Sequence, residues 1–151
     1  MIVRRNVIFQ STAFNTSEPK DYFINDCCYG DDLARWIMER LRAGCIHTEQ
    51  EPGQEDFGWF FTFRVGETDY DLVIGYRPGE ENKPGDWMCS IERRAGLIGS
   101  IFGKRNRGIQ PDAPETIHAV LSSSPQITGV RWFTDEDYRT VENGQTTPTV
   151  A

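Results

Sequence analysis

One segment near the middle of the chain, residues 55–65, constrains the fold more than any other. Its sequence, EDFGWFFTFRV, has a large apolar residue at every second position. Successive side chains of a strand point to opposite faces of a sheet. The segment therefore predicts the central strand of a packed sheet, which begins just after an acidic pair, Glu55 and Asp56. One face of this strand would carry Phe57, Trp59, Phe61, Phe63 and Val65.

The segments on either side add strands to the same sheet. Residues 69–77 alternate in the same way, and a turn at residues 66–68 separates them from the aromatic segment. This arrangement predicts an antiparallel hairpin. Similar apolar patterns predict further strands over residues 2–10, 46–51, 87–91 and 127–133.

Two segments have the spacing of amphipathic helices. The first, over residues 31–43, repeats a large apolar residue every four positions and has Asp31 as its candidate N-cap. The second, over residues 113–123, follows Asp112 as its candidate N-cap and stops before Pro125.

The resulting order of elements is β-α-β-β-β-β-α-β. Consecutive strands joined by short turns predict an α+β fold, in which a mainly antiparallel sheet of about five to six strands carries two helices. A chain of 151 residues is long enough for one domain with its own hydrophobic core. We assign this domain to residues 1–139 and a flexible C-terminal tail to residues 140–151.

The charge balance restricts the partners of the protein. Lys and Arg number 16 against 23 Asp and Glu, which gives a net charge of −7. Such a field disfavours general nucleic-acid binding and speeds encounter with a basic protein. No apolar run is long enough to cross a bilayer, and the N-terminus lacks the features of a signal peptide. We therefore expect a cytoplasmic protein.

Carboxylates are the first candidates for chemistry. Glu55 and Asp56 precede one strand of the predicted hairpin, and Asp69 and Asp71 lie on the other. Together they could hold a divalent cation or supply a general acid and base, but the turn puts the two pairs at opposite ends. A solvated sheet face is therefore favoured. Alternatively, Glu55 and Asp56 could cap the turn before the aromatic strand by accepting backbone N–H groups.

Other side chains form weaker patterns. A zinc site would draw on Cys27 or Cys28, Cys45, His47 and Cys89, but no loop supplies a close ligand pair, and reduced structural cysteines are favoured. His118 is offset from the apolar stripe of the second helix and is expected to be exposed. Motifs for a phosphate loop or an activated nucleophile are absent. The sequence therefore predicts no catalytic residue, no metal and no cofactor.

A basic stretch interrupts the acidic chain between residues 93 and 107. A short apolar run is flanked there by Arg93, Arg94, Lys104, Arg105 and Arg107. Such a segment could bind an acidic surface, a nucleic-acid backbone or an anionic membrane. A short helix or turn that packs on the core is favoured, because the apolar run is too brief for stable membrane binding.

Several of these motifs occur together in one arrangement. It comprises GDDLARWI at residues 30–37, EDFGW at residues 55–59, RAGLI and FGK at residues 94–104, and GVRW at residues 129–132. The arrangement resembles small uncharacterised bacterial proteins with an E-D-x-G-W motif, over about residues 30–133. The resemblance implies a bacterial cytoplasmic α+β protein of an immunity-like or accessory type. It implies no catalytic residues.

We therefore expect a non-enzymatic binding or accessory protein that neutralises or escorts a basic protein partner. Its candidate binding residues are Glu55, Asp56 and Trp59. Two alternatives stay open: a small enzyme with a carboxylate-based site near Glu55 and Asp56, and an adaptor that uses the basic residues of the 93–107 segment. The sequence does not determine the oligomeric state.

Overall fold

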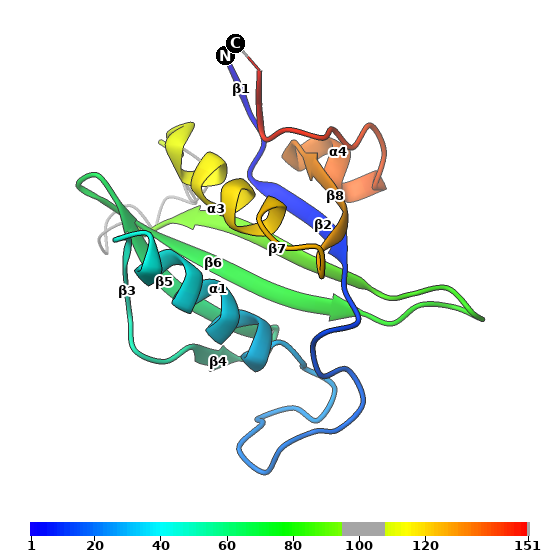
Figure 1. Cartoon of the computed structure of the whole chain (residues 1–151). Helices are drawn as coiled ribbons and strands as arrows, with labels where there is room; N and C mark the ends of the chain where they lie inside the picture. The colour runs from blue at the N-terminus through cyan, green and yellow to red at the C-terminus, as the bar shows by residue number, and fades with distance from the viewer. Residues whose placement is uncertain (95–107, 151) are drawn as a thin grey trace.

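The computed structural model describes residues 1–94 and 108–150, which adopt the expected α+β fold (Figure 1). The main sheet has seven strands in the order β3-β5-β6-β7-β2-β8, with β4 paired to β5 on the same side as β3. All of these pairings are antiparallel. The strands are Asn6–Gln10 (β2), His47–Thr48 (β3), Gly53–Glu55 (β4), Gly58–Val65 (β5), Thr68–Arg77 (β6), Asp86–Arg93 (β7) and Thr128–Phe133 (β8).

A second, two-stranded sheet joins the ends of the described chain. β1 (Ile2–Val3) pairs antiparallel with β9 (Thr149–Val150). Figure 1 shows both termini close together at the top of the molecule. Residues 2–10, predicted as one strand, are thus divided between two sheets. Residues 140–151, predicted as a flexible tail, include the strand that pairs with β1.

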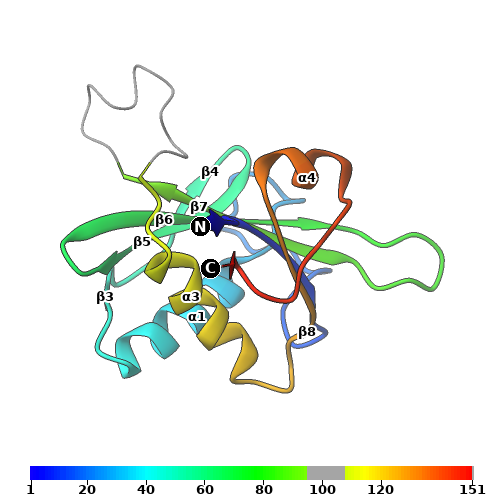
Figure 2. The same cartoon turned by 90° about the horizontal axis from the view of Figure 1, so that it is seen from above.

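Two helices cover one face of the main sheet, and a short helix lies on the opposite side (Figure 2). α1 (Asp31–Ala43) spans the predicted residues, and α3 (Asp112–Ser122) begins and ends one residue before the predicted bounds. α4 (Asp135–Thr140) was not predicted; the Thr134 side chain caps it by accepting from the amide of Asp137 at 3.2 Å. No helix of the described residues is long and apolar enough to cross a membrane.

The two long helices begin differently from the prediction. Gly30, not Asp31, is the N-cap of α1, and Pro111, not Asp112, precedes α3. Asp31 is buried in the first turn of α1, at 5% exposure. Gly30 has φ 135°, and a Cβ at this position would press on core side chains. The close approach of the chain to the sheet therefore requires glycine at the start of α1.

The hydrophobic core fills the space between the main sheet and its two long helices. Phe61, Leu72 and Ile74 from the sheet and Ile37 and Leu41 from α1 are at most 1% exposed. Truncating such a side chain to alanine costs about 2–5 kcal/mol. β5 has partners on both sides, but it lies nearer the sheet edge than β6 and β7. This packing holds β5, and the turn before it, in a fixed position.

The E-D-x-G-W motif forms a tight turn between β4 and β5. β4 ends at Glu55 and β5 begins at Gly58, so Asp56 and Phe57 form a two-residue loop. Gly58 has φ 142°, and a Cβ there would collide with the carbonyl oxygen of Ile74. The motif therefore needs its glycine for this turn. Phe57, predicted to begin the buried face, is instead 56% exposed.

Candidate binding surface

Two segments far apart in the sequence lie together at one end of the main sheet, away from the termini (Figure 1). They are residues 21–28, from the connection between β2 and α1, and residues 54–57, from the β4–β5 hairpin. Gln54 links them, because its Nε2 donates to the carbonyl oxygen of Tyr22 at 2.7 Å and its Oε1 accepts from the amide of Ile24 at 2.8 Å. We call the exposed side chains of these two segments the loop surface.

Trp59 supports the loop surface from below. It is 3% exposed, and its indole Nε1–H donates to the carbonyl oxygen of Cys28 at 2.8 Å. Its ring meets Phe23 and Tyr22 edge-on, with centroid distances of 5.5 and 6.2 Å. Trp59 therefore positions the loop surface, and its own ring is covered.

Three large hydrophobic side chains are exposed on the loop surface. Tyr22 is 54% exposed, Ile24 is 59% exposed and Phe57 is 56% exposed. The other exposed large hydrophobic side chains of the described residues lie at the opposite end, on or beside β1 and β9. Apolar groups gathered in one place on a soluble protein indicate an interaction surface. Tyr22 and Ile24 were not among the predicted binding residues, although apolar residues within a polar connection were a usable signal.

Carboxylates surround these hydrophobic side chains. Asp21, Asp26, Glu55 and Asp56 are all exposed, and neither segment contains Lys or Arg. Within residues 1–94 and 108–150, none of the four carboxylates has a hydrogen bond or ion pair. The hypothesis that Glu55 and Asp56 cap the turn is therefore wrong. The loop surface therefore combines apolar area with four carboxylates that have no hydrogen bond or ion pair among the described residues.

Tyr22 is fixed in place by α1. Its hydroxyl donates to the buried carboxylate of Asp31. This hydrogen bond, followed by burial and by the negative charge of Asp31, raises the pKa of Tyr22. The phenol therefore stays neutral at physiological pH, and its ring remains oriented on the loop surface.

The face of the main sheet opposite α1 and α3, which we call the open face, also carries many charges. Four ion pairs lie on this face. The ion pairs join Arg64 to Asp69 at 3.6 Å, Arg94 to Asp71 at 3.6 Å, Arg77 to Asp86 at 2.7 Å and Arg5 to Asp135 at 2.7 Å. As expected, the Glu55–Asp56 pair and the Asp69–Asp71 pair lie at opposite ends of the hairpin. Asp69 and Asp71 each have an arginine as partner.

A buried polar network lies on the open face where α4 packs on β2 and β7. Asn6 is 2% exposed, and its Nδ2 donates to Asp135 at 2.8 Å. Its Oδ1 accepts from the Ser90 hydroxyl at 2.7 Å. Burial raises the pKa of the neighbouring Tyr138, and this effect outweighs a hydrogen bond with Ser90 that lowers the pKa. The network is therefore satisfied internally and links α4 to the sheet.

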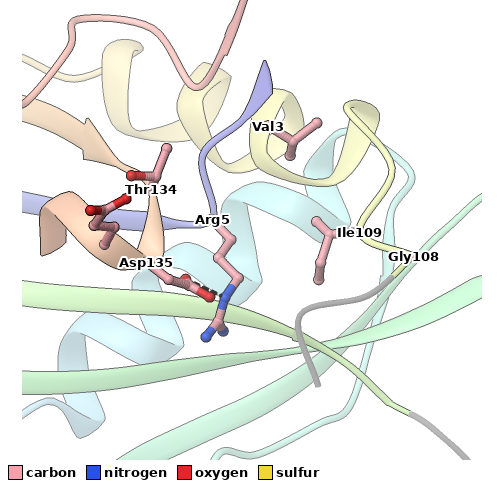
Figure 3. Close-up of a pocket in the computed structure, with 7 residues that line it drawn as sticks. Val3, Arg5, Gly108, Ile109, Thr134 and Asp135 are labelled. Atoms are coloured by element: carbon pink, nitrogen blue, oxygen red, sulfur yellow. Dashed lines mark hydrogen bonds and ion pairs between the residues drawn. The ribbon is translucent and has the colours of Figure 1, made fainter. Parts of the chain in front are cut away.

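Two hollows adjoin α4. The first, of about 430 Å³, is lined by Val3, Arg5, Gly108, Ile109, Thr134, Asp135 and Glu136 (Figure 3). The second, of about 370 Å³, also includes Arg5 and Asp135. Figure 3 shows the Arg5 guanidinium directed at the Asp135 carboxylate, at 2.7 Å. The two hollows thus share a charged pair that is already neutralised.

The residues of the hypothetical zinc site are dispersed. Cys89 is buried in the core, and burial strongly raises the pKa of its thiol. Cys45 and His47 are exposed after α1, whereas Cys27 and Cys28 belong to the loop surface. In the described part of the chain, no three His, Cys, Asp or Glu side chains are close enough to hold a metal ion.

His118 was expected to be exposed and is instead half-buried between α3 and β8. Its Nδ1 accepts from the indole Nε1–H of Trp132 at 3.0 Å, and its Nε2 is 3.3 Å from Oγ of Ser122. Because Nδ1 accepts, the proton of the neutral ring is on Nε2, which donates to Ser122. In this arrangement the imidazole does not act as a base toward the serine hydroxyl.

The basic segment is only partly described. Arg93 donates to the carbonyl oxygen of Gly108 at 3.5 Å, and Arg94 hydrogen-bonds to Thr62 beside its ion pair with Asp71. The remaining basic residues of that prediction, Lys104, Arg105 and Arg107, lie outside the described residues. Of the predicted binding residues, only Glu55 and Asp56 therefore belong to the loop surface.

Comparisons of the chain with protein-family models, with curated proteins and with solved structures find no significant match.

Proposed function

We propose that the protein is a non-enzymatic binding protein that holds a basic protein partner on its loop surface. The observation that carries this proposal is the combination, in one place, of three exposed hydrophobic side chains and four exposed carboxylates. Aromatic and aliphatic anchors supply most of the affinity at protein interfaces. Surrounding charges speed encounter and select partners of opposite charge.

The rest of the molecule supports this choice of surface. On the open face, four carboxylates are already paired with arginines, at 2.7 to 3.6 Å. A partner that bound there would have to break these pairs, which costs free energy. On the loop surface, cations of a partner would meet carboxylates that have no such competitor among the described residues.

The form of this function that we propose is immunity-like or accessory. The protein would neutralise or escort a basic partner in a bacterial cytoplasm, in agreement with the net charge of −7. A rigid support favours this role, because the Trp59–Cys28 and Gln54 hydrogen bonds hold the surface in one shape before the partner arrives. Preorganisation of this kind reduces the entropy lost on binding.

The test is affinity capture from a lysate of the host, compared between matched variants. Glu55→Gln/Asp56→Asn removes two charges from the loop surface. Glu80→Gln/Glu81→Gln removes two adjacent exposed charges from the β6–β7 loop and serves as the control. We expect the first variant to bind the captured basic partner about tenfold more weakly, which is about 1.4 kcal/mol.

The apolar part of the surface is tested by Ile24→Ser/Phe57→Ser, which we also expect to weaken binding by at least about tenfold. The control variant should bind like the wild type. The proposal would be overturned if the control variant lost as much partner binding as the loop-surface variants. It would also be overturned if both loop-surface variants bound the partner like the wild type. If no partner is retained, the proposal also fails, and the carboxylate-based enzyme is the hypothesis to test next.

A further inference from the structure

Two adjacent cysteines, Cys27 and Cys28, lie on the loop surface as free thiols. Cys27 is exposed and Cys28 is partly buried. A turn holds them, in which the amide of Cys28 donates to the carbonyl oxygen of Asn25 at 3.0 Å. The Cys28 thiol also donates to the carbonyl oxygen of Asp56 at 3.6 Å, across to the β4–β5 hairpin. The Cys28 sulfur therefore lies against the β4–β5 hairpin, and the exposed Cys27 thiol is next to it in the chain.

The two thiols differ in reactivity. Burial, followed by a hydrogen bond with the Cys27 thiol, raises the pKa of Cys28, and the nearby charge of Asp56 acts in the same direction. At neutral pH Cys28 is therefore protonated and reacts slowly by itself. The exposed Cys27 is the thiol that a reagent reaches first.

A direct disulfide between these cysteines is disfavoured by geometry. Adjacent Cα atoms are about 3.8 Å apart across a trans peptide bond. Ordinary disulfides join Cα atoms at least about 4.4 Å apart, so a bond between neighbours strains the backbone. An atom inserted between the two sulfurs removes this restriction, because each sulfur then bonds to the inserted atom.

We propose that Cys27 and Cys28 form a dithiol site for a thiophilic trivalent arsenical, which bonds both sulfur atoms at once. With phenylarsine oxide as the probe, two S–H bonds and the arsenic–oxygen bond break, and two sulfur–arsenic bonds form. The two thiol protons leave with the oxide oxygen as one water molecule, and no oxidant is needed. Once Cys27 has reacted, the second bond forms within the molecule and gains from the high effective concentration of Cys28.

Occupation of the dithiol site would also disturb the loop surface. The effect of this disturbance on partner binding rests on the proposed function. Cys28 accepts the Trp59 indole hydrogen bond through its carbonyl oxygen and contacts Asp56 through its sulfur. An arsenic atom held by both sulfurs replaces the contact with Asp56 and adds bulk to the loop surface. Partner binding should therefore fall when the site is filled.

The test is intact-protein mass spectrometry after treatment of the reduced, folded chain with phenylarsine oxide and then with excess monothiol. Monothiols remove arsenicals held by one sulfur, and dithiols are needed to remove those held by two. We expect one arsenical per chain to survive the monothiol and to be released by dithiothreitol. Cys27→Ser and Cys28→Ser should each lower the surviving adduct by about tenfold or more, because chelation is lost.

Cys45→Ser is the matched control, since Cys45 is exposed but has no neighbouring cysteine. It should retain the adduct fully. An adduct that survives in Cys28→Ser, or one that disappears in Cys45→Ser, would overturn the dithiol site; a melting curve for each variant checks that it is folded. Partner capture is measured separately on the loaded protein, so that failure of the proposed function leaves the mass-spectrometric result intact.

Discussion

The open face and the loop surface are both rich in carboxylates, but the carboxylates of the open face form ion pairs and those of the loop surface do not. On the open face, Asp71, Asp86 and Asp135 each have an arginine within 3.6 Å. On the loop surface, the carboxylates of Glu55 and Asp56 have no hydrogen bond or ion pair with the described residues, and exposed hydrophobic side chains lie beside them. Both regions contain several carboxylates, and they differ in whether arginines are present to pair with them.

The difference indicates where stability and binding reside. A carboxylate that is paired within the fold contributes to folding, and its removal leaves a partner group unsatisfied. An exposed carboxylate without a partner contributes little to folding, so its removal affects mainly what the surface binds.

Asn6→Ala should have the largest effect, because it removes the centre of the buried network on the open face. The change removes one hydrogen-bond partner from Ser90 and one from Asp135. We expect a loss of about 2–3 kcal/mol in the free energy of unfolding, measured by urea denaturation. Gln126→Ala, at an exposed amide side chain after α3, is the control and should change the stability by less than about 0.5 kcal/mol. Similar values for the two variants would contradict the structural role of the open face.

Asp86→Asn tests a paired carboxylate at the edge of the same face. Burial acts to raise the pKa of Asp86, but hydrogen bonds from Arg77 and Gln10 outweigh it, so the pKa lies below its ordinary value of 3.8. The ionised group therefore stabilises the fold above pH 3.8, and this contribution is lost as the pH falls through the lowered pKa.

We expect Asp86→Asn to lower the free energy of unfolding by about 1 kcal/mol at neutral pH, where the charge-assisted hydrogen bonds of Asp86 are complete. Urea denaturation repeated below pH 3.8 should show a smaller difference between the variant and the wild type. A difference that is independent of pH would show that the charge of Asp86 has no part in folding.

Glu55→Gln/Asp56→Asn should have the smallest effect on stability, although it alters the proposed binding surface. Both side chains are exposed, and neither takes part in a hydrogen bond or ion pair with the described residues. We expect the free energy of unfolding to change by less than about 0.5 kcal/mol. A loss above 1 kcal/mol would mean that these carboxylates serve the fold and would remove the contrast with the open face.

Much of the fold was predictable because its signals are local. The helix over residues 31–43 is predicted by an apolar spacing that continues over several helical turns. The hairpin of β5 and β6 is predicted by an apolar alternation along both strands. The three-residue strand β4, the two-residue strand β9 and the six-residue helix α4 were not predicted, because they are too short for such periodicity. They depend on pairing and capping with distant residues, which spacing in the sequence does not reveal.

The candidate site was predictable only in part for the same reason. The position of Glu55 and Asp56 before an aromatic strand identified one half of the loop surface. The other half comes from residues 21–28, which are brought there by Gln54 and Trp59 through hydrogen bonds across about thirty positions of sequence. Whether a carboxylate is paired is also a property of the folded state, as Asp71 and Asp56 show.

The most direct test of the binding surface is zero-length cross-linking with a carbodiimide, which joins carboxylates to lysine amines in contact. The cross-linked complex with the captured basic partner is digested, and the joined peptides are mapped by mass spectrometry. We predict cross-links from partner lysines to Glu55 and Asp56, and to Asp21 or Asp26 across the same surface. Cross-links that map instead to Asp69, Asp71 or Asp86 would place the partner on the open face and contradict the proposed function.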